Sequence, residues 1–440
     1  MTASFRWGTQ GEIYEIEEGA LTQTLVQDGL ERIEDVLSAK PFFPLDLTDD
    51  GLRQVALRDY VPGWATSAPF YVRRNGIAGV LCTRAADVRS VYMDTDRFVM
   101  KSPGLPGYEV FDVFGGLESV LQMDGDRHSR VRRLMNPAFS PVGLTNIRPA
   151  MQKIVTESLD AIAARAPAFD AMADFCNTLI MRTLLDATFN LTREQQAAFE
   201  RMHNSIAMAT QFRPGEARPQ EFTDAVIAVR TVIAEVIEER RRTPGNDFIS
   251  SLITARDEGS KLSDEELYGQ INTICGAAIG STAGALGAVL YVLGKNPAEF
   301  DKLKRNPEMI AVSLDECTRI HGPGLFSFTR FATADTEVGG TQILKDMPVF
   351  VSPQAANYDP EEYDDPGRLD LSRKPKSIMS FGTGPHHCIG VRMAKMAMQM
   401  GLAGLIERFP GLRLSDPDFT PVYSGSVGTM SIVSLPMLTH

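Results

Sequence analysis

The chain has 440 residues, a formal net charge of −12 at pH 7 and no run of basic residues interleaved with aromatic ones. This charge balance argues against nucleic acid as a partner, because a nucleic-acid-binding surface must be positive. At roughly 150 residues for each domain the length predicts two or three domains, but no linker, repeat or low-complexity tract divides the sequence. The five cysteines are scattered and odd in number, which favours a reducing cytoplasm over a disulfide framework.

The first 40 residues contain no apolar signal or anchor segment, so we expect no membrane anchor. An acidic stretch in this part of the chain predicts a helix from about Glu15 to Leu37. We treat residues 1–40 as an N-terminal extension and assign it no function.

A small β region is predicted to follow. Residues 71–81 alternate between the two faces of an extended chain around the pair Asn75-Gly76. Asn-Gly between two such runs is typical of a two-residue β-hairpin turn.

A helix is predicted to begin after Asp124, and on it His128 and Arg132 lie four residues apart on one face. Two interpretations are open at this point. The pair could be part of an ordinary exposed basic face, since further arginines accompany it, or it could bind an acidic group. The accompanying residues are Arg127, Arg130 and Arg133.

The longest stretch without a charged residue runs from Tyr268 to Gly294. Its glycines at every fourth position, 276 to 284, would suggest close packing in a membrane helix. Polar residues interrupt the stretch, however, so we expect a long buried helix through a globular core. Ser263 and Glu266 form a capping-box pattern at its start.

Residues 381–390 read Phe-Gly-Thr-Gly-Pro-His-His-Cys-Ile-Gly, and the apolar run from Val391 predicts a helix behind them. Glycines at 382, 384 and 390 allow left-handed backbone angles and close approach to a flat cofactor. We expect the amides of the helix N-terminus to point at the Cys388 sulfur and lower its pKa. Structural zinc would need four ligands in spaced pairs, and a phosphate loop would need a Lys after its glycines; neither pattern is present.

The pattern F-G-x-G-x-H-x-C-x-G resembles the ligand loop of the cytochrome P-450 family of haem-thiolate monooxygenases. Other segments resemble that family in the same order along the chain. They are the hairpin with Asp96-Arg-Phe98, the H-x-x-x-R of His128 and Arg132, the E-x-x-R of Glu316 and Arg319, the turn and strand at Pro323 and Arg330, and residues 356–360 and 363–373. The resemblance implies a mainly α fold with a small β region, and one catalytic domain over residues 41–440.

The resemblance also implies a cofactor and the residues that hold it. The cofactor would be haem b, iron protoporphyrin IX, with Cys388 as the iron ligand in a loop that includes Phe381, Gly382 and Gly390. A thiolate ligand favours cleavage of the O–O bond of bound dioxygen. Four residues would bind the haem propionates: His128, Arg132, Arg330 and His386. Glu316 and Arg319 would pair on one helix face and support the core behind the loop.

The sequence departs from the family in the long apolar helix. The family usually has A-G-x-[Asp/Glu]-Thr-Thr there, whereas residues 277–282 place Gly280 at the acid position and Ser281 at the first hydroxyl position. A register shifted by one residue would give Thr282 the hydroxyl role. Three explanations are open: Ser281 or Thr282 relays protons with ordered water, the substrate supplies the group, or the protein uses peroxide, isomerises or only binds its ligand.

By resemblance, mostly apolar side chains line the pocket above the haem. They are Phe111, Phe114, Ala277, Ala278, Leu325, Phe326, Phe328 and Val427. Such a pocket predicts a hydrophobic small molecule with a terpenoid, steroid or aromatic skeleton, free or bound to a carrier protein. Electrons would come from NAD(P)H through a ferredoxin reductase and a ferredoxin. Basic residues around the cysteine loop would attract an acidic ferredoxin, or form no more than a solvated rim.

Overall fold

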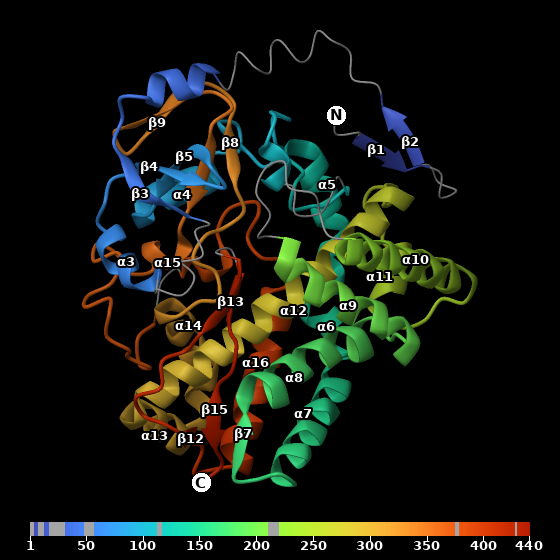
Figure 1. Ribbon diagram of the computed structural model, residues 1–440. Helices are drawn as coiled ribbons and strands as arrows, with labels where there is room; N and C mark the ends of the chain where they lie inside the picture. Colours follow the sequence, from blue (N-terminus) through green and yellow to red (C-terminus); the bar gives the residue numbers. More distant parts are fainter. Residues whose placement is uncertain are drawn as a thin grey trace.

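The computed structural model describes residues 4–7, 13–16, 31–47, 57–111, 117–209, 220–374, 378–426 and 429–440. Helices make up most of it, and a smaller region of β-sheet lies to one side (Figure 1). The helices are α3 (Leu57–Trp64), α4 (Ala85–Met93), α5 (Gly125–Met135), α6 (Pro141–Thr145), α7 (Arg148–Ala163), α8 (Asn177–Arg182), α9 (Arg193–Ala209), α10 (Gln220–Arg242), α11 (Phe248–Thr254), α12 (Asp264–Lys295), α13 (Pro297–Arg305), α14 (Ile310–Ile320), α15 (Pro353–Ala356) and α16 (Val391–Arg408), and residues 31–37 are also helical. The predicted class, mainly α with a small β region, is confirmed.

The main sheet has six strands in the order β3-β4-β5-β11-β8-β6. These are β3 (Phe42–Asp46), β4 (Phe70–Arg74), β5 (Ile77–Cys82), β6 (Phe98–Val99), β8 (Arg330–Ala332) and β11 (Pro348–Val351). Smaller sheets pair β1 (Ser4–Trp7) with β2 (Ile13–Ile16), β9 (Thr336–Val338) with β10 (Thr341–Ile343), β13 (Tyr423–Ser426) with β14 (Thr429–Ile432), and β12 (Arg413–Leu414) with β15 (Pro436–Leu438) and β7 (Ala168–Asp170).

The two faces of the main sheet have different neighbours. Val80 of β5 and Val349 of β11 pack against Tyr92 of α4. Val72 of β4 and Phe350 of β11 belong to a second apolar cluster on the opposite face. This division follows from the strand geometry, because successive side chains point to opposite faces.

The predicted hairpin is confirmed. Strands β4 and β5 pair antiparallel, and Asn75 (φ 54°) and Gly76 (φ 76°) both adopt left-handed angles in the turn. The carboxylate of Asp46 accepts hydrogen bonds from both turn amides, at 3.0 Å from the Asn75 nitrogen and 2.6 Å from the Gly76 nitrogen. The adjacent strand β3 therefore holds the turn that the Asn-Gly pair predicts.

The expected helix in the N-terminal extension is only partly correct. Glu15 lies in β2 and pairs with Phe5 of β1, whereas residues 31–37 are helical. Residues 13–16, Ile-Tyr-Glu-Ile, are mostly β-branched or aromatic, which favours a strand when a partner strand is available. Residues 17–30 lie outside the described part of the chain.

Helix α12 passes through the centre of the helical region (Figure 1). Its capping box is formed as predicted, because Ser263 and Glu266 each accept the other's backbone N–H. Among the described helices it alone is long and apolar enough to cross a membrane, but 67% of its most apolar window is buried within the protein. The prediction of a core helix is therefore confirmed.

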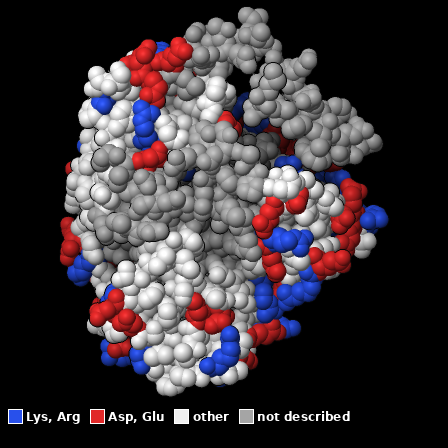
Figure 2. All heavy atoms as spheres, viewed as in Figure 1, with Lys and Arg blue, Asp and Glu red and all other residues white. Residues whose placement is uncertain are grey.

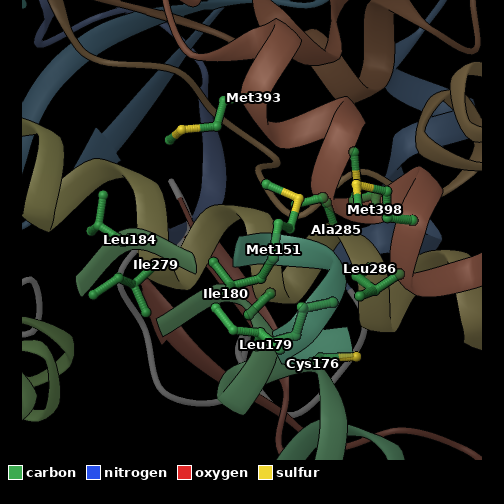
Figure 3. Packing of buried hydrophobic residues seen from close by; sticks show 14 of the residues in the cluster. Met151, Cys176, Leu179, Ile180, Leu184, Ile279, Ala285, Leu286, Met393 and Met398 are labelled. Carbon is green, nitrogen blue, oxygen red and sulfur yellow. The ribbon is translucent and has the colours of Figure 1, made fainter. Parts of the chain in front are cut away.

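The core around α12 explains its spaced glycines. Ile279 and Leu286 of α12 pack with Leu179 of α8 and Met398 of α16 (Figure 3). Gly284, one of the spaced glycines, has little room: an added Cβ would lie 3.1 Å from the Ser431 hydroxyl oxygen and 3.4 Å from the Pro323 side chain. The small residues thus allow close packing within one globular core, where van der Waals contact needs dense interdigitation.

The surface charge agrees with the sequence. On the face shown in Figure 2, acidic and basic side chains intermix over α10, at the right-hand edge. The described residues there therefore show both signs of charge side by side (Figure 2).

A fully buried ion pair joins α14 to the segment before the cysteine loop. The Arg319 guanidinium donates to both carboxylate oxygens of Glu316 at 2.8 Å, and both side chains have 0% exposure. Arg319 also donates to the carbonyls of Asn357 at 2.8 Å and Pro366 at 2.7 Å. Arg373 adds a second bond to Glu316 at 3.2 Å. The pair therefore fixes the path of residues 357–373 on the end of α14.

Replacing Arg319 with methionine (Arg319→Met) should lower the free energy of unfolding by about 3–5 kcal/mol, because it leaves a buried carboxylate without its main partner. Urea denaturation followed by circular dichroism measures the loss. The matched control is Arg165→Met, which removes a largely exposed pair with Asp174 and should cost less than about 1 kcal/mol. Equal losses in the two variants would contradict this account of the buried pair.

Candidate active site

The cysteine loop takes its shape from two of its three glycines. Gly382 and Gly384 have φ values of 68° and 72°, which L side chains rarely adopt. A side chain at Gly384 would also lie 2.8 Å from the Tyr92 carbonyl oxygen. Gly390 departs from the expectation: its φ is −83°, and an added Cβ would meet only Phe139, at 4.0 Å. Its backbone therefore needs no glycine.

The Cys388 sulfur lies just before the N-terminus of α16, which begins at Val391 as predicted. The Cys388 amide donates to the Phe381 carbonyl at 2.9 Å, which closes the loop. Burial raises the pKa of the Cys388 thiol, while the amides of Gly390 and Val391 and the Arg132 guanidinium lower it. The expected net lowering is thus wrong for the protein alone, because the amides only partly offset desolvation. A bound metal would complete the deprotonation.

Two imidazoles lie together beside this loop. The rings of His128 on α5 and His386 in the loop have centroids 4.1 Å apart. His128 Nε2 and His386 Nδ1 are buried and have no hydrogen-bond partner. Burial, together with His128, Arg330 and Arg132, lowers the pKa of His386 to about 3, so the ring is neutral.

The arginines of α5 divide into two groups. Arg132 donates to the His387 carbonyl of the cysteine loop. The others pair with acids: Arg127 with Glu118, Arg130 with Glu266, and Arg133 with Asp257. The basic-face interpretation therefore describes these three arginines, whereas His128 and Arg132 face the loop.

Arg330 on β8 approaches the same place from the sheet. It is 2% exposed, and its guanidinium lies 4.4 Å from the centroid of the Tyr92 ring. It forms no ion pair with any described carboxylate and donates only to the Phe328 carbonyl, at 3.3 Å. Sequence analysis missed Tyr92, because a tyrosine on the apolar face of α4 is typical of a core residue, and only the sheet register brings Arg330 against it.

These groups require an acidic ligand. Buried polar nitrogens without partners are costly, and a buried guanidinium without an anion is more so. His128, His386 and Arg330, with Arg132 beside them, present donors from three separate segments to one space next to Cys388. A planar group with two carboxylates and a thiolate-binding metal fits this donor set.

Helix α12 contains the residues predicted to act on oxygen and protons. Ala277, Ala278, Gly280, Ser281 and Thr282 keep part of their surface accessible, while their neighbours Ile279 and Ala283 are buried. The Ser281 hydroxyl donates to the Ala277 carbonyl at 2.6 Å. No described residue of α12 between 267 and 294 is acidic. This stretch of the helix thus offers small residues and two hydroxyls, and no carboxylate.

The predicted pocket side chains are only partly brought together. Phe111 packs against Tyr108 and Phe331, with ring centroids 5.7 and 5.8 Å away, and Phe328 is 39% exposed. Leu325 and Phe326 are buried in the apolar cluster that also contains Trp64. This is the cluster on the face of the main sheet that carries Phe350. Phe114 and Val427 lie outside the described residues.

A hollow of about 650 Å³ opens beside Cys388, on the side of residues 132–140. Its lining includes three arginines, Arg132, Arg133 and Arg392, and one acid, Asp257. The cysteine therefore lies close to a surface of mainly positive charge.

The fold and this site define a haem-thiolate protein. The cytochrome P-450 family model matches residues 69–432, so the chain belongs to the cytochrome P-450 family. It is an enzyme of the monooxygenase class with haem iron as its cofactor, and its donor set fits that group.

Named relatives and solved structures agree with this assignment. The chain is 31% identical over 363 residues to mycinamicin IV hydroxylase/epoxidase of Micromonospora griseorubida, which covers 81% of this chain and 89% of that protein. It is 33% identical over 306 residues to 2-hydroxy-5-methyl-1-naphthoate 7-hydroxylase of Streptomyces carzinostaticus, covering 68% and 72%. The structure of the cytochrome P-450 PksS of the Bacillus subtilis bacillaene polyketide synthase superposes with a TM-score of 0.80 at 25% identity, over 90% of this chain and 99% of that one.

The variant His128→Phe should release haem about ten to a hundred times faster than the parent. It removes one hydrogen bond to a carboxylate, which is worth about 1.5–3 kcal/mol. Transfer of haem to apomyoglobin, followed by absorbance, measures the rate. His387→Phe is the matched control, because the His387 side chain is exposed, and it should release haem at the parental rate. An unchanged rate in His128→Phe would remove that residue from the haem site.

Proposed function

We propose that Cys388 binds the iron of haem b as a thiolate and that the enzyme inserts one oxygen atom from dioxygen into a hydrophobic small molecule. The observation that carries this proposal is the Cys388 sulfur beside the amides of Gly390 and Val391, next to buried imidazole nitrogens without partners. When bound, haem with a thiolate ligand supplies the oxygen-activating chemistry. Phe381, Gly382 and Gly390 shape the loop around that ligand.

His128, Arg132, Arg330 and His386 hold the two haem propionates in this proposal. Their convergence from α5, β8 and the loop supports it, and so does the lack of described anionic partners for Arg330. Each contact to a carboxylate is charge-assisted and removes the cost of an unpaired buried donor. Glu316 and Arg319 act at a distance, by fixing the chain that enters the loop.

In this proposal Ser281 and Thr282 transfer protons to dioxygen through water, because position 280 is a glycine and not an acid. The Ser281 hydroxyl bonds to Ala277, so its oxygen is free to accept a hydrogen bond from water in the pocket. Rotation of the hydroxyl away from Ala277 lets it donate instead. Gly280 leaves room for an ordered water, and relays through water are adequate for proton transfer.

The substrate class follows from the small and aromatic residues near the site. Ala277, Ala278 and Gly280 leave space, and Phe111 and Phe328 offer apolar surface. Relatives are named for the oxidation of mycinamicin IV and of a methylnaphthoate. We infer a terpenoid, steroid or aromatic skeleton, oriented mainly by shape.

The electron donor is a separate protein, for which we propose an acidic ferredoxin reduced by a ferredoxin reductase. The arginine-lined hollow beside Cys388 supports this choice, because opposite charges speed association. Residues 41–440 then act as one catalytic domain in the cytoplasm, with residues 1–40 as an extension. The family match over residues 69–432 supports a single catalytic unit.

The variant Cys388→Ala should lose the thiolate-type absorption band of the reduced carbon monoxide complex completely. The control is Cys82→Ala, a buried cysteine of β5 whose raised pKa keeps it a neutral thiol. We expect that variant to keep the band. An unchanged spectrum in Cys388→Ala would overturn the ligand assignment.

The variant Ser281→Ala should lower the product formed per NAD(P)H consumed by about tenfold, with the difference appearing as hydrogen peroxide. Thr282→Ala should have the smaller effect, about twofold, because Ser281 occupies the first hydroxyl position and Thr282 only supports it. Product and peroxide assays with a surrogate ferredoxin system measure both. The reverse order of effects would transfer the proposed role of Ser281 to Thr282.

A second candidate function is favoured by the missing carboxylate on α12. A haem-thiolate protein that uses peroxide, isomerises its substrate or only binds a ligand needs no proton relay to dioxygen. Reconstitution with the electron-transfer proteins and dioxygen separates the two. Oxygenated product supports the monooxygenase, whereas product formed only with added peroxide supports the second candidate.

A further inference from the structure

Arg74, at the end of β4, carries a positive charge that neither the haem nor the fold accounts for. It lies on the face of the sheet that holds Val72 and Phe350. Arg330, by contrast, packs on Tyr92 with the cluster on the opposite face. The two arginines are therefore on opposite faces, and Arg74 does not belong to the group proposed for the propionates.

The surroundings of Arg74 are aromatic. Its guanidinium carbon lies 5.7 Å from the centroid of the Phe350 ring and 6.0 Å from that of Phe111, a predicted pocket residue. Its Nη1 reaches the Thr329 hydroxyl at 3.4 Å, at the limit of a hydrogen bond. Its Nε is buried and has no partner.

No carboxylate among the described residues forms an ion pair with Arg74. Its neighbour Arg73, on the other side of the strand, makes a bidentate pair with Glu34 at 2.9 and 2.8 Å. Asp46 attracts Arg74 only from a longer distance, and its oxygens accept the turn amides. Arg73 thus has a carboxylate partner within the protein, whereas Arg74 has none among the described residues.

The charge on Arg74 persists at neutral pH. Burial lowers its pKa to about 10, which still leaves the guanidinium protonated. A partly desolvated cation gains some stability from aromatic faces, but a carboxylate that accepts two of its hydrogen bonds stabilises it more. The planar fork of an arginine matches a carboxylate with two parallel hydrogen bonds.

We propose that Arg74 binds a carboxylate of the substrate, so that the enzyme acts on a hydrophobic carboxylic acid. This inference rests on the proposed monooxygenase function and narrows its substrate class. The acid group pairs with the guanidinium between Phe350 and Phe111, and Phe111, a predicted pocket residue, links this position to the proposed pocket. Arg74 is then a specificity-determining residue that takes no part in oxygen chemistry.

Binding to the ferric holoenzyme tests the proposal. Dodecanoic acid and naphthoic acid, each beside its methyl ester, are titrated at pH 8 while the low-spin to high-spin shift of the haem is recorded. We expect each acid to bind at least about tenfold more tightly than its ester, because a hydrogen bond to a charged group is worth about 1.5–3 kcal/mol. Arg74→Gln should reduce that ratio to within about twofold, and Arg74→Lys should keep part of it.

Arg73→Gln is the matched control, since it removes an adjacent arginine that is already paired, and it should keep the parental ratio. The carbon monoxide spectrum of each variant reports whether the holoenzyme is folded and retains its thiolate ligand. Loss of that spectrum in the parent protein would be a failure of the proposed function. An intact spectrum with equal affinity for acid and ester, or with no shift for any acid, would overturn the role of Arg74 alone.

A purely structural role gives a different pattern. If Arg74 only covers the apolar sheet face with its aliphatic part, Arg74→Gln lowers the free energy of unfolding but leaves the acid-to-ester ratio unchanged. That result would also overturn the proposal.

Discussion

Burying a positive charge is costly unless an anion lies beside it, and the described structure buries Arg319 and Arg330 almost completely and Arg74 in part. These arginines differ in whether an anion of the protein lies beside them. Arg319 finds its anion within the protein, in Glu316. Arg330 has none among the described residues, which is consistent with a cofactor that brings carboxylates of its own. Arg74 has none either, and lies on the other face of the sheet.

This constraint links the fold to the site. The ion pair of Glu316 and Arg319 sets the path of the chain from Asn357 onward through bonds to backbone carbonyls. That path delivers the cysteine loop to the end of α4, where Gly384 lies against the Tyr92 carbonyl. The imidazole of His386 then meets that of His128 on α5. A buried pair with no catalytic part of its own therefore helps to set where the groups proposed to bind haem meet.

Helix α12 shows a second constraint: a small side chain at position 280 leaves space, but it cannot also supply an acid for proton transfer. Small residues at 277, 278 and 280 open room beside the site, but the glycine also removes the acid that this position usually carries. The hydroxyl of Ser281 is held by the Ala277 carbonyl. Proton delivery in the proposed function therefore depends on water, and water entry in turn depends on how well the substrate fills the pocket.

Local pattern determined much of this protein. The Asn-Gly hairpin, the capped helix from Asp264, the pairing of Glu316 with Arg319 and the loop before Val391 all follow from residues close together in the sequence, because turn angles, caps and helical faces depend on near neighbours. The cysteine loop, to which the proposed function assigns haem binding, was recognisable for the same reason. The strand that contains Glu15 could not be recognised in this way, because so short a segment is a strand only when another strand pairs with it.

Only the tertiary structure decided what depends on distant contacts. Burial raises the pKa of Cys388 more than the helix amides lower it, which no spacing reveals. The sheet register places Tyr92 under Arg330 and separates Arg330 from Arg74 on opposite faces. Leu325 and Phe326 are apolar like the other predicted pocket residues, yet the packing of the cluster around Trp64 buries them. Burial, register and the presence of an anion are properties of the folded chain, since each is set by residues far apart in the sequence.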